Sequence, residues 1–301
     1  MSIDLKQVKQ FGNIEFLAKQ LVEGFVTGLH KSPYHGFSVE FAEHRLYNSG
    51  ESTRHIDWKV YGKTDRLYTK RYEEETNLRC NILIDTSSSM YYPEENNGKI
   101  TFSIMGAACL AYMLQTQRDA VGFCSFSSEI EIQTPIKSTP GHLHSIFLQL
   151  EKLLQQKQIN KKTSVASVLH QVADRMNKRS LIILFTDMFD NVEEQENIFS
   201  ALQHLKHNKH EVLLFHVLDE KTEGKFEFEE RPYEFIDIES GEKVKIQPSE
   251  IKDFYISESK KFYDALKLRC GQYKIDFVEA DISKGFQQIL YAYLVKRSRM
   301  K

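Results

Sequence analysis

The chain has 301 residues, of which 41% are hydrophobic and 27% charged, a composition typical of an ordered globular protein with room for one large α/β domain and a smaller addition. Its 40 Lys and Arg residues nearly balance its 42 Asp and Glu residues, so no overall charge directs it towards nucleic acid. The longest apolar run is too short to span a bilayer and the N-terminus lacks the apolar stretch of a signal peptide, so we expect a cytoplasmic protein without a membrane span.

The first 77 residues have a pattern of their own. An amphipathic helix is predicted near Ile14–His30, a strand at Phe37–Phe41, and then a polar, charged stretch that ends at Glu75. The apolar face of the helix needs a surface to cover it. We therefore expect residues 1–77 to form a smaller N-terminal α+β subdomain that packs on a main domain of residues 78–301.

From Leu78 onward, short β-branched runs alternate with longer amphipathic stretches, the pattern of a parallel sheet covered by helices. Strands are predicted at Arg79–Ile84, Ala120–Phe126, Leu181–Thr186, Val212–Leu218 and Lys274–Ala280. Helices are predicted at Lys99–Gln117, Gly141–Gln156, Ser164–Asn177, Val192–Lys206, Pro248–Arg269 and Lys284–Lys296. Continuous apolar strands indicate burial on both faces, so Arg79–Ile84 should lie at the centre of the sheet.

Two segments depart from this parallel pattern. Glu129–Gln133 alternates apolar and polar residues directly after a strand, which predicts an antiparallel edge strand. Residues 223–247 alternate again, first at Lys225–Glu229 and then around Ser240–Gly241, which predicts an inserted hairpin. The expected fold class is thus α/β: a mostly parallel sheet with one antiparallel edge strand and helices on both faces.

A cluster of oxygen-bearing side chains follows the first predicted strand. Asp85 ends that strand, and Ser87 and Ser89 lie on the loop after it. Open α/β sheets bind ligands at the carboxyl ends of their strands, and a carboxylate with two hydroxyls suits Mg²⁺. Later loops at the same edge carry Thr163 and Asp187, which can complete the set. We predict a metal site here, for Mg²⁺ with Mn²⁺ or Ca²⁺ as alternatives.

Further motifs carry a resemblance to a known family. Besides the DTSSSM sequence of Asp85–Met90, the chain has GESTRHIDW at Gly50–Trp58, then Thr64–Leu67 and Arg71–Glu75. Over most of its length the chain resembles the von Willebrand factor A-like proteins of the family called domain of unknown function 58. The resemblance implies a von Willebrand factor A-type fold with a metal-ion-dependent adhesion site formed by Asp85, Ser87, Ser89, Thr163 and Asp187.

The same resemblance implies what such a site binds. An acidic side chain of a protein partner would complete the coordination of the metal, and AAA+ ATPases of the MoxR type are implied as partners. One position departs from the family: many A-type domains place a glycine directly before the threonine, where this chain has Lys162. Ser164 is therefore an alternative to Thr163 as the ligand from this loop.

These features favour a metal-dependent protein-binding module rather than an enzyme. The main alternative is a Mg²⁺-dependent phosphohydrolase of the haloacid dehalogenase type, which also uses an aspartate after a buried strand, here Asp85, to form an acyl phosphate. That chemistry needs a second aspartate two positions later as acid and base, where this chain has Ser87. The sequence contains neither the GxSxG motif of serine hydrolases nor a glycine-rich nucleotide loop.

Overall fold

The computed structural model describes residues 13–30, 44–46, 58–70, 78–94, 98–155, 164–176, 179–187, 195–236 and 241–300. The chain divides into two compact units. The larger unit comprises the residues up to Thr27 together with Leu78–Lys301, and the smaller one is Gly28–Asn77.

The smaller unit contains two short strands and a short helix. Strand β1 (His44–Leu46) pairs antiparallel with β2 (Tyr68–Lys70), and helix α3 (Trp58–Thr64) lies between them in the chain. The predicted strand at Phe37–Phe41 lies outside the described residues. The packing of this unit on the main domain stays a prediction.

Helix α2 (Ile14–His30) has the predicted bounds and belongs to the larger unit up to Thr27. Ile14 is buried, and its main-chain N–H donates a hydrogen bond of 3.0 Å to the Glu151 carboxylate in helix α5 (Pro140–Gln155). This helix, which the sequence grouped with residues 28–77, is therefore part of the same compact unit as the sheet.

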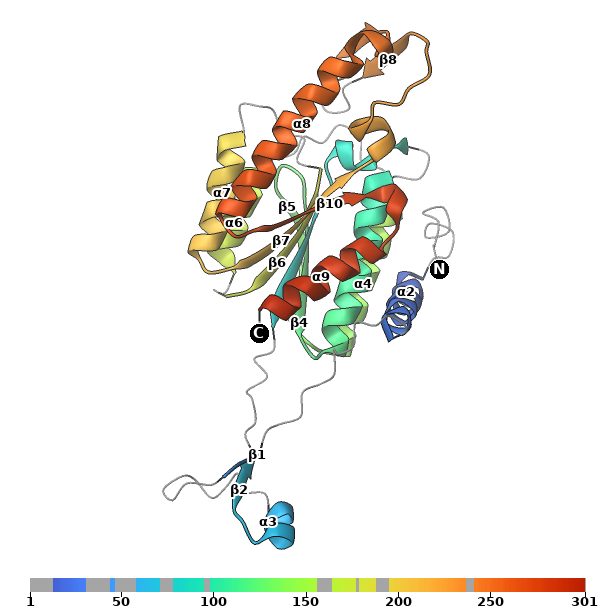
Figure 1. Cartoon of the computed structure of the whole chain (residues 1–301). Helices are drawn as coiled ribbons and strands as arrows, with labels where there is room; N and C mark the ends of the chain where they lie inside the picture. Colours follow the sequence, from blue (N-terminus) through green and yellow to red (C-terminus); the bar gives the residue numbers. More distant parts are fainter. Residues whose placement is uncertain are drawn as a thin grey trace. The chain divides into compact units, whose positions relative to one another are not determined.

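A six-stranded sheet forms the centre of the larger unit (Figure 1), in the order β10-β7-β6-β3-β4-β5. Its strands are β3 (Arg79–Asp85), β4 (Ala120–Phe126), β5 (Ile130–Gln133), β6 (Leu181–Thr186), β7 (Glu211–Leu218) and β10 (Asp276–Asp281). Every neighbouring pair is parallel except β4 with β5. As predicted, β3 is a central strand with Asp85 at its carboxyl end.

Helices cover both faces of this sheet. They are α4 (Gly98–Thr116), α5, α6 (Val165–Arg175), α7 (Gln195–His207), α8 (Pro248–Gln272) and α9 (Gln287–Arg299). Leu184 of β6 packs in an apolar cluster with α6 and α7, whereas a Cβ at Gly106 of α4 would lie 3.3 Å from the ring of Phe185. Because neighbouring strand residues point to opposite faces, α4 and the α6–α7 pair lie on opposite sides. The predicted α/β fold class, a mostly parallel sheet with one antiparallel edge strand and helices on both faces, is confirmed.

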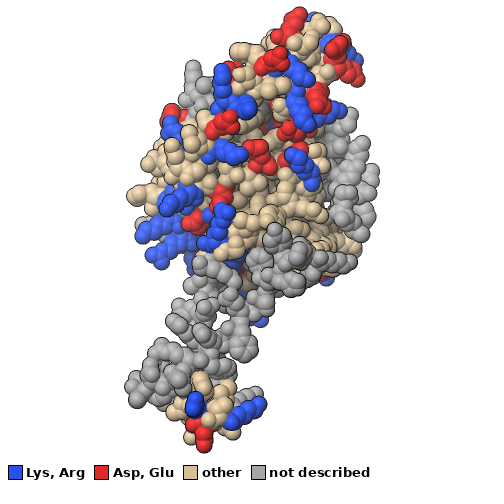
Figure 2. Space-filling model, viewed as in Figure 1, with Lys and Arg blue, Asp and Glu red and all other residues tan. Residues whose placement is uncertain are grey.

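The charged side chains on the surface reflect the nearly equal numbers of basic and acidic residues in the sequence. On the visible face of the larger unit, basic and acidic side chains are interspersed (Figure 2). None of the helices in the described part of the chain combines the length and the apolar character that a bilayer crossing requires.

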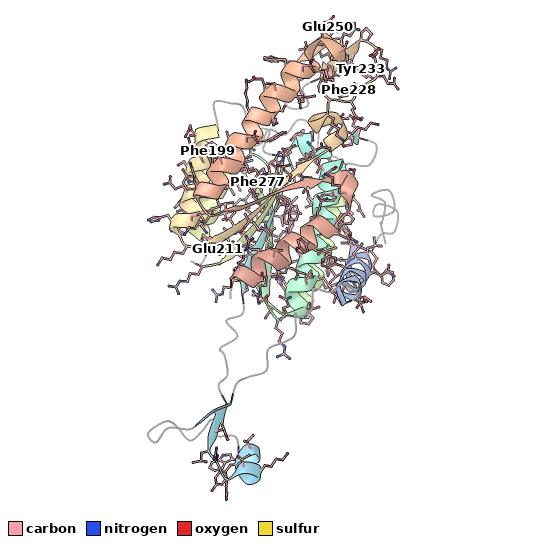
Figure 3. All side chains as sticks on the ribbon, in the orientation of Figure 1. Phe199, Glu211, Phe228, Tyr233, Glu250 and Phe277 are labelled. Atoms are coloured by element: carbon pink, nitrogen blue, oxygen red, sulfur yellow. The ribbon has the colours of Figure 1, made fainter. Side chains whose placement is uncertain are left out.

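A hairpin lies within the predicted insertion, and it is shorter than the alternating pattern. Strands β8 (Tyr233–Ile236) and β9 (Lys243–Ile246) pair antiparallel, after a five-residue π-helix η5 (Glu220–Gly224). The alternating segment Lys225–Glu229 forms no strand. Its Phe228 instead packs against Tyr233, with ring centroids 5.5 Å apart (Figure 3). The alternation there reflects an aromatic cluster rather than strand pairing.

Candidate functional site

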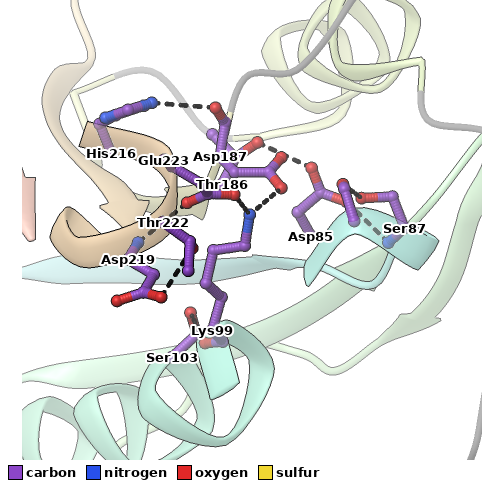
Figure 4. Close-up of polar contacts among 11 residues, drawn as sticks. Asp85, Ser87, Lys99, Ser103, Thr186, Asp187, His216, Asp219, Thr222 and Glu223 are labelled. Carbon is purple, nitrogen blue, oxygen red and sulfur yellow. Dashed lines mark hydrogen bonds and ion pairs between the residues drawn. The ribbon is translucent and has the colours of Figure 1, made fainter. Parts of the chain in front are cut away.

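The carboxyl ends of β3, β6 and β7 meet at one edge of the sheet, which we call the rim (Figure 4). The parallel register sets Ile84 opposite Phe185 and Thr186 opposite His216. The residues that follow these strands therefore emerge side by side. Asp85 and Asp187, predicted from separate parts of the sequence, both lie here and are both buried.

The loop Asp85–Ser89, called here the DxSxS loop, is held by hydrogen bonds to the Asp85 carboxylate. Its Oδ1 accepts the main-chain N–H of Ser87 at 2.9 Å, and its Oδ2 accepts the hydroxyl of Thr186 at 2.7 Å. A 3₁₀ turn that begins at Ser88 then folds the chain back, so the hydroxyl oxygens of Ser87 and Ser89 lie 3.1 Å apart. One carboxylate and two hydroxyls are thus gathered on a single short loop.

The Asp85 carboxylate is in an environment that disfavours its charge. Burial, and next the nearby negative charge of Asp187, raise the pKa of Asp85 to about 7. The hydrogen bonds from Ser87 and Thr186 act in the opposite direction, because they stabilise the ionised form. A positive charge placed beside these two carboxylates would favour ionisation of Asp85.

A lysine lies within this buried region. Lys99, in the first turn of α4, donates from Nζ to Oδ2 of Asp187 at 2.9 Å and also to Oε1 of Glu223 in η5. Its side chain is 1% exposed. Burial by itself lowers the pKa of the ammonium, but the Asp187 and Glu223 carboxylates outweigh it and raise that pKa above its ordinary value. We call Lys99, Asp187 and Glu223 the charged cluster.

Two neighbouring groups fix the positions of this cluster. Burial lowers the pKa of His216 to about 4, so its imidazole is neutral at neutral pH. Its Nε2 lies 2.9 Å from the Asp187 carbonyl oxygen, which can only accept, so Nε2 carries the proton. The main-chain N–H of Asp219 donates to the other oxygen of Glu223 at 2.9 Å. Asp187 and Glu223 are therefore each held by more than Lys99 alone.

The structure brings most of the predicted site residues to the rim. Asp85, Ser87 and Ser89 share the DxSxS loop, and the charge of Asp187 acts on Asp85. Thr163 lies outside the described residues. Its alternative Ser164 precedes α6 and donates its main-chain N–H to the carbonyl of Ser127 at 3.2 Å.

Sequence reasoning missed Lys99 and Glu223, and it did not foresee the hydrogen bond from Thr186 to Asp85. One signal for Lys99 was present, because it is the single charged residue of α4 and precedes an uncharged run that is almost wholly buried. A lysine in such a helix is almost never buried unless it is paired. Among the described residues, no three His, Cys, Asp or Glu side chains are grouped to hold a metal.

The sequence of the chain matches a known protein family. The family model described as "Protein of unknown function DUF58" matches residues 43–261, which include the DxSxS loop and the whole charged cluster. The chain belongs to this DUF58 family. Among the relatives of this DUF58 chain are Uncharacterized protein Rv1480 of Mycobacterium tuberculosis and Uncharacterized protein Mb1516 of Mycobacterium bovis. Each is 21% identical over 216 residues, and the match spans 72% of this chain and 66% of the relative.

Solved structures to which this chain is similar include two from Bacteroides. An aerotolerance-related membrane protein from Bacteroides fragilis is 13% identical, with a TM-score of 0.46, over 73% of this chain and 97% of that one. BatB from Bacteroides thetaiotaomicron is 11% identical, with a TM-score of 0.42, over 74% and 100%. The SpRpn10 VWA domain is 14% identical, with a TM-score of 0.33, over 46% and 75%.

Proposed function

We propose that this DUF58 protein is a metal-dependent protein-binding module. Asp85, Ser87 and Ser89 would hold one Mg²⁺, with Thr163 and Asp187 as the ligands from the neighbouring loops. When bound, the ion supplies a positive charge at the rim that an acidic side chain of a partner protein can bind. Mn²⁺, which shares the preference for oxygen ligands, would serve as a substitute.

The arrangement of the Ser87 and Ser89 hydroxyls carries this proposal. The two hydroxyls are hydrogen-bonded to each other with their oxygens 3.1 Å apart, and the Ser87 side chain also hydrogen-bonds to Asp85. Two ligands on adjacent corners of an octahedron around Mg²⁺ lie about 2.9 Å apart when each is about 2.0 to 2.1 Å from the ion. The observed pair is therefore close to the separation that adjacent ligands need.

The electrostatics of Asp85 add support. Burial and Asp187 raise the pKa of Asp85 to about 7, so the ionised form of this carboxylate is disfavoured in the folded chain. A bound cation would stabilise that ionised form, because it displaces the proton and offsets the repulsion between the two carboxylates. The hydroxyl of Thr186 and the main-chain N–H of Ser87 would orient Asp85 for this role, as outer hydrogen bonds orient metal ligands generally.

We further propose that the protein is not an enzyme. The phosphohydrolase alternative needs a second aspartate two positions after Asp85 as acid and base, and this chain has Ser87 there. Hydrolysis of an aryl phosphate by the purified chain separates the two functions. Turnover that requires Mg²⁺ and is lost in Asp85→Asn would favour the phosphohydrolase.

For the partner, we propose a MoxR-type AAA+ ATPase that presents an acidic side chain to the metal. The support is the family resemblance together with the chemistry of the rim. The test is capture of partners from the native cell by the tagged chain, with Mg²⁺ or with chelator, followed by identification of the retained proteins. The ATPase should be retained by the wild type only with Mg²⁺.

Two variants make that test specific. Asp85→Ala should abolish retention of the ATPase, whereas Asp253→Ala, at an exposed position on α8, should leave it unchanged. Retention that survives both chelator and Asp85→Ala would show that the DxSxS loop is a structural turn.

A further inference from the structure

Lys99 is a buried lysine that lies between two buried carboxylates. Its ammonium touches the carboxylate of Asp187, a proposed metal ligand, and that of Glu223, and all three side chains are at most 11% exposed. Burying charges is costly, and apolar side chains in the same space often give equal or greater stability. Stability alone is therefore a weak explanation for three buried charged groups at this place.

The cluster joins three segments that are far apart in the sequence. Lys99 comes from the start of α4, Asp187 follows β6, and Glu223 belongs to η5, which leads into the inserted hairpin. Asp187 thus faces a cation on the Lys99 side while its charge still acts on Asp85. Lys99 is thus paired directly with the carboxylate whose charge acts on Asp85.

We propose that Lys99 is a specificity-determining residue, whose buried positive charge lets the rim accept a carboxylate from outside. This inference rests on the proposed function. The ammonium offsets part of the negative charge of Asp187 and Glu223, so a divalent ion held at Asp85 keeps more of its own charge for an external ligand. Without Lys99, the same ion would be bound more tightly by the protein and would attract an external carboxylate less.

If Lys99 has this role, its removal changes the affinity for the divalent ion and the affinity for an external carboxylate in opposite directions. Loss of a residue with a purely structural role does not have this effect. Removing one positive charge near the ion strengthens its attraction to the site and weakens that of any incoming anion. Removing one negative charge has the reverse effect. A residue that only holds the loops in place would, when lost, weaken both affinities together.

The experiment uses the full chain at pH 8, with Mn²⁺ as the metal probe and acetate as the carboxylate probe. Mn²⁺ affinity is measured by electron paramagnetic resonance, and acetate affinity by its effect on water proton relaxation at the bound Mn²⁺. The variants are Lys99→Met, Glu223→Gln and the combination of both. The combination changes the side chains but keeps the net charge of the cluster, so it is the matched control.

Lys99→Met should tighten Mn²⁺ binding by about tenfold or more and weaken acetate binding, since a unit charge at this range in a buried site has an effect of that order. Glu223→Gln, which keeps the ion pair between Lys99 and Asp187, should weaken Mn²⁺ binding and tighten acetate binding. The combined variant should resemble the wild type. Glu223→Gln tests the inference even where Lys99→Met does not fold.

Two failures can be told apart. If the wild type binds Mn²⁺ but the variants shift both affinities in the same direction, or shift neither, Lys99 does not set the specificity and only this inference is overturned. If the wild type binds no Mn²⁺, the proposed function itself is wrong and the inference is overturned with it.

Discussion

Replacing Asp85 by asparagine should separate metal binding from folding. Asp85→Asn keeps the shape of the side chain and one carbonyl oxygen, which can accept the hydrogen bond from Ser87 or from Thr186. It removes the negative charge that burial and Asp187 disfavour. We therefore expect a variant that binds no Mg²⁺ and yet is more stable than the metal-free wild type at alkaline pH.

The size of this effect follows from the pKa of Asp85, which is about 7 in the folded chain against an ordinary value of 3.8. Because the folded pKa is the higher one, the wild type loses stability as the pH rises from 3.8 to about 7, by about 4 kcal/mol at about 1.4 kcal/mol per pKa unit. Weaker hydrogen bonds to the neutral amide offset part of the gain. A net stabilisation of about 1 to 3 kcal/mol remains for Asp85→Asn at pH 8.

Thermal unfolding at pH 8 measures both consequences. In chelator, Asp85→Asn should unfold about 5 °C above the wild type, given about 2 to 4 °C per kcal/mol for a unit of this size. Mg²⁺ at a hundred times its dissociation constant should stabilise the wild type by about 2.7 kcal/mol and the variant not at all. Asp253→Asn, on the exposed surface of α8, is the control. A variant less stable than the wild type in chelator would refute the electrostatic reasoning.

Three further predictions concern the same unit. Lowering the pH from 8 to 6 should weaken Mg²⁺ binding about tenfold in calorimetry, because protons compete for Asp85 around its pKa of about 7; constant affinity would contradict this. Thr186→Val removes a buried donor to Asp85 and should cost about 1 to 3 kcal/mol in urea unfolding, and an unchanged midpoint would refute the role of this hydrogen bond. Gly106→Val should cost about 1 to 3 kcal/mol without affecting Mg²⁺ binding, because a Cβ there would lie 2.6 Å from Ile289 of α9; normal stability would disprove that close contact.

The buried strands could be predicted well from the sequence. The predicted ranges of β4 and β6 coincide with the observed ones, because strands buried on both faces consist of unbroken apolar runs. The start of β10 was two residues off. Lys274 adopts a φ of 56° in the turn that ends α8, a backbone conformation that the apolar pattern of the following residues does not reveal.

The sequence predicts only those parts of the site whose residues are close together in the chain. Asp85, Ser87 and Ser89 share one loop, so their spacing alone places them together. Lys99 and Glu223 are 124 residues apart in the chain, and no spacing rule links them. Their contact depends on how α4 and η5 meet at the rim, which follows from packing of the whole unit rather than from any local pattern.

Calorimetric titration of Mg²⁺ into the chelator-treated chain at pH 8 is a direct test of a metal site at the DxSxS loop. We predict that the wild type binds a single ion and that this binding is lost when Ser87 and Ser89 are both replaced by alanine, with the thermal unfolding of this variant in chelator little changed. No binding by the wild type, or equal binding by the serine-free variant, would contradict a metal site at the DxSxS loop.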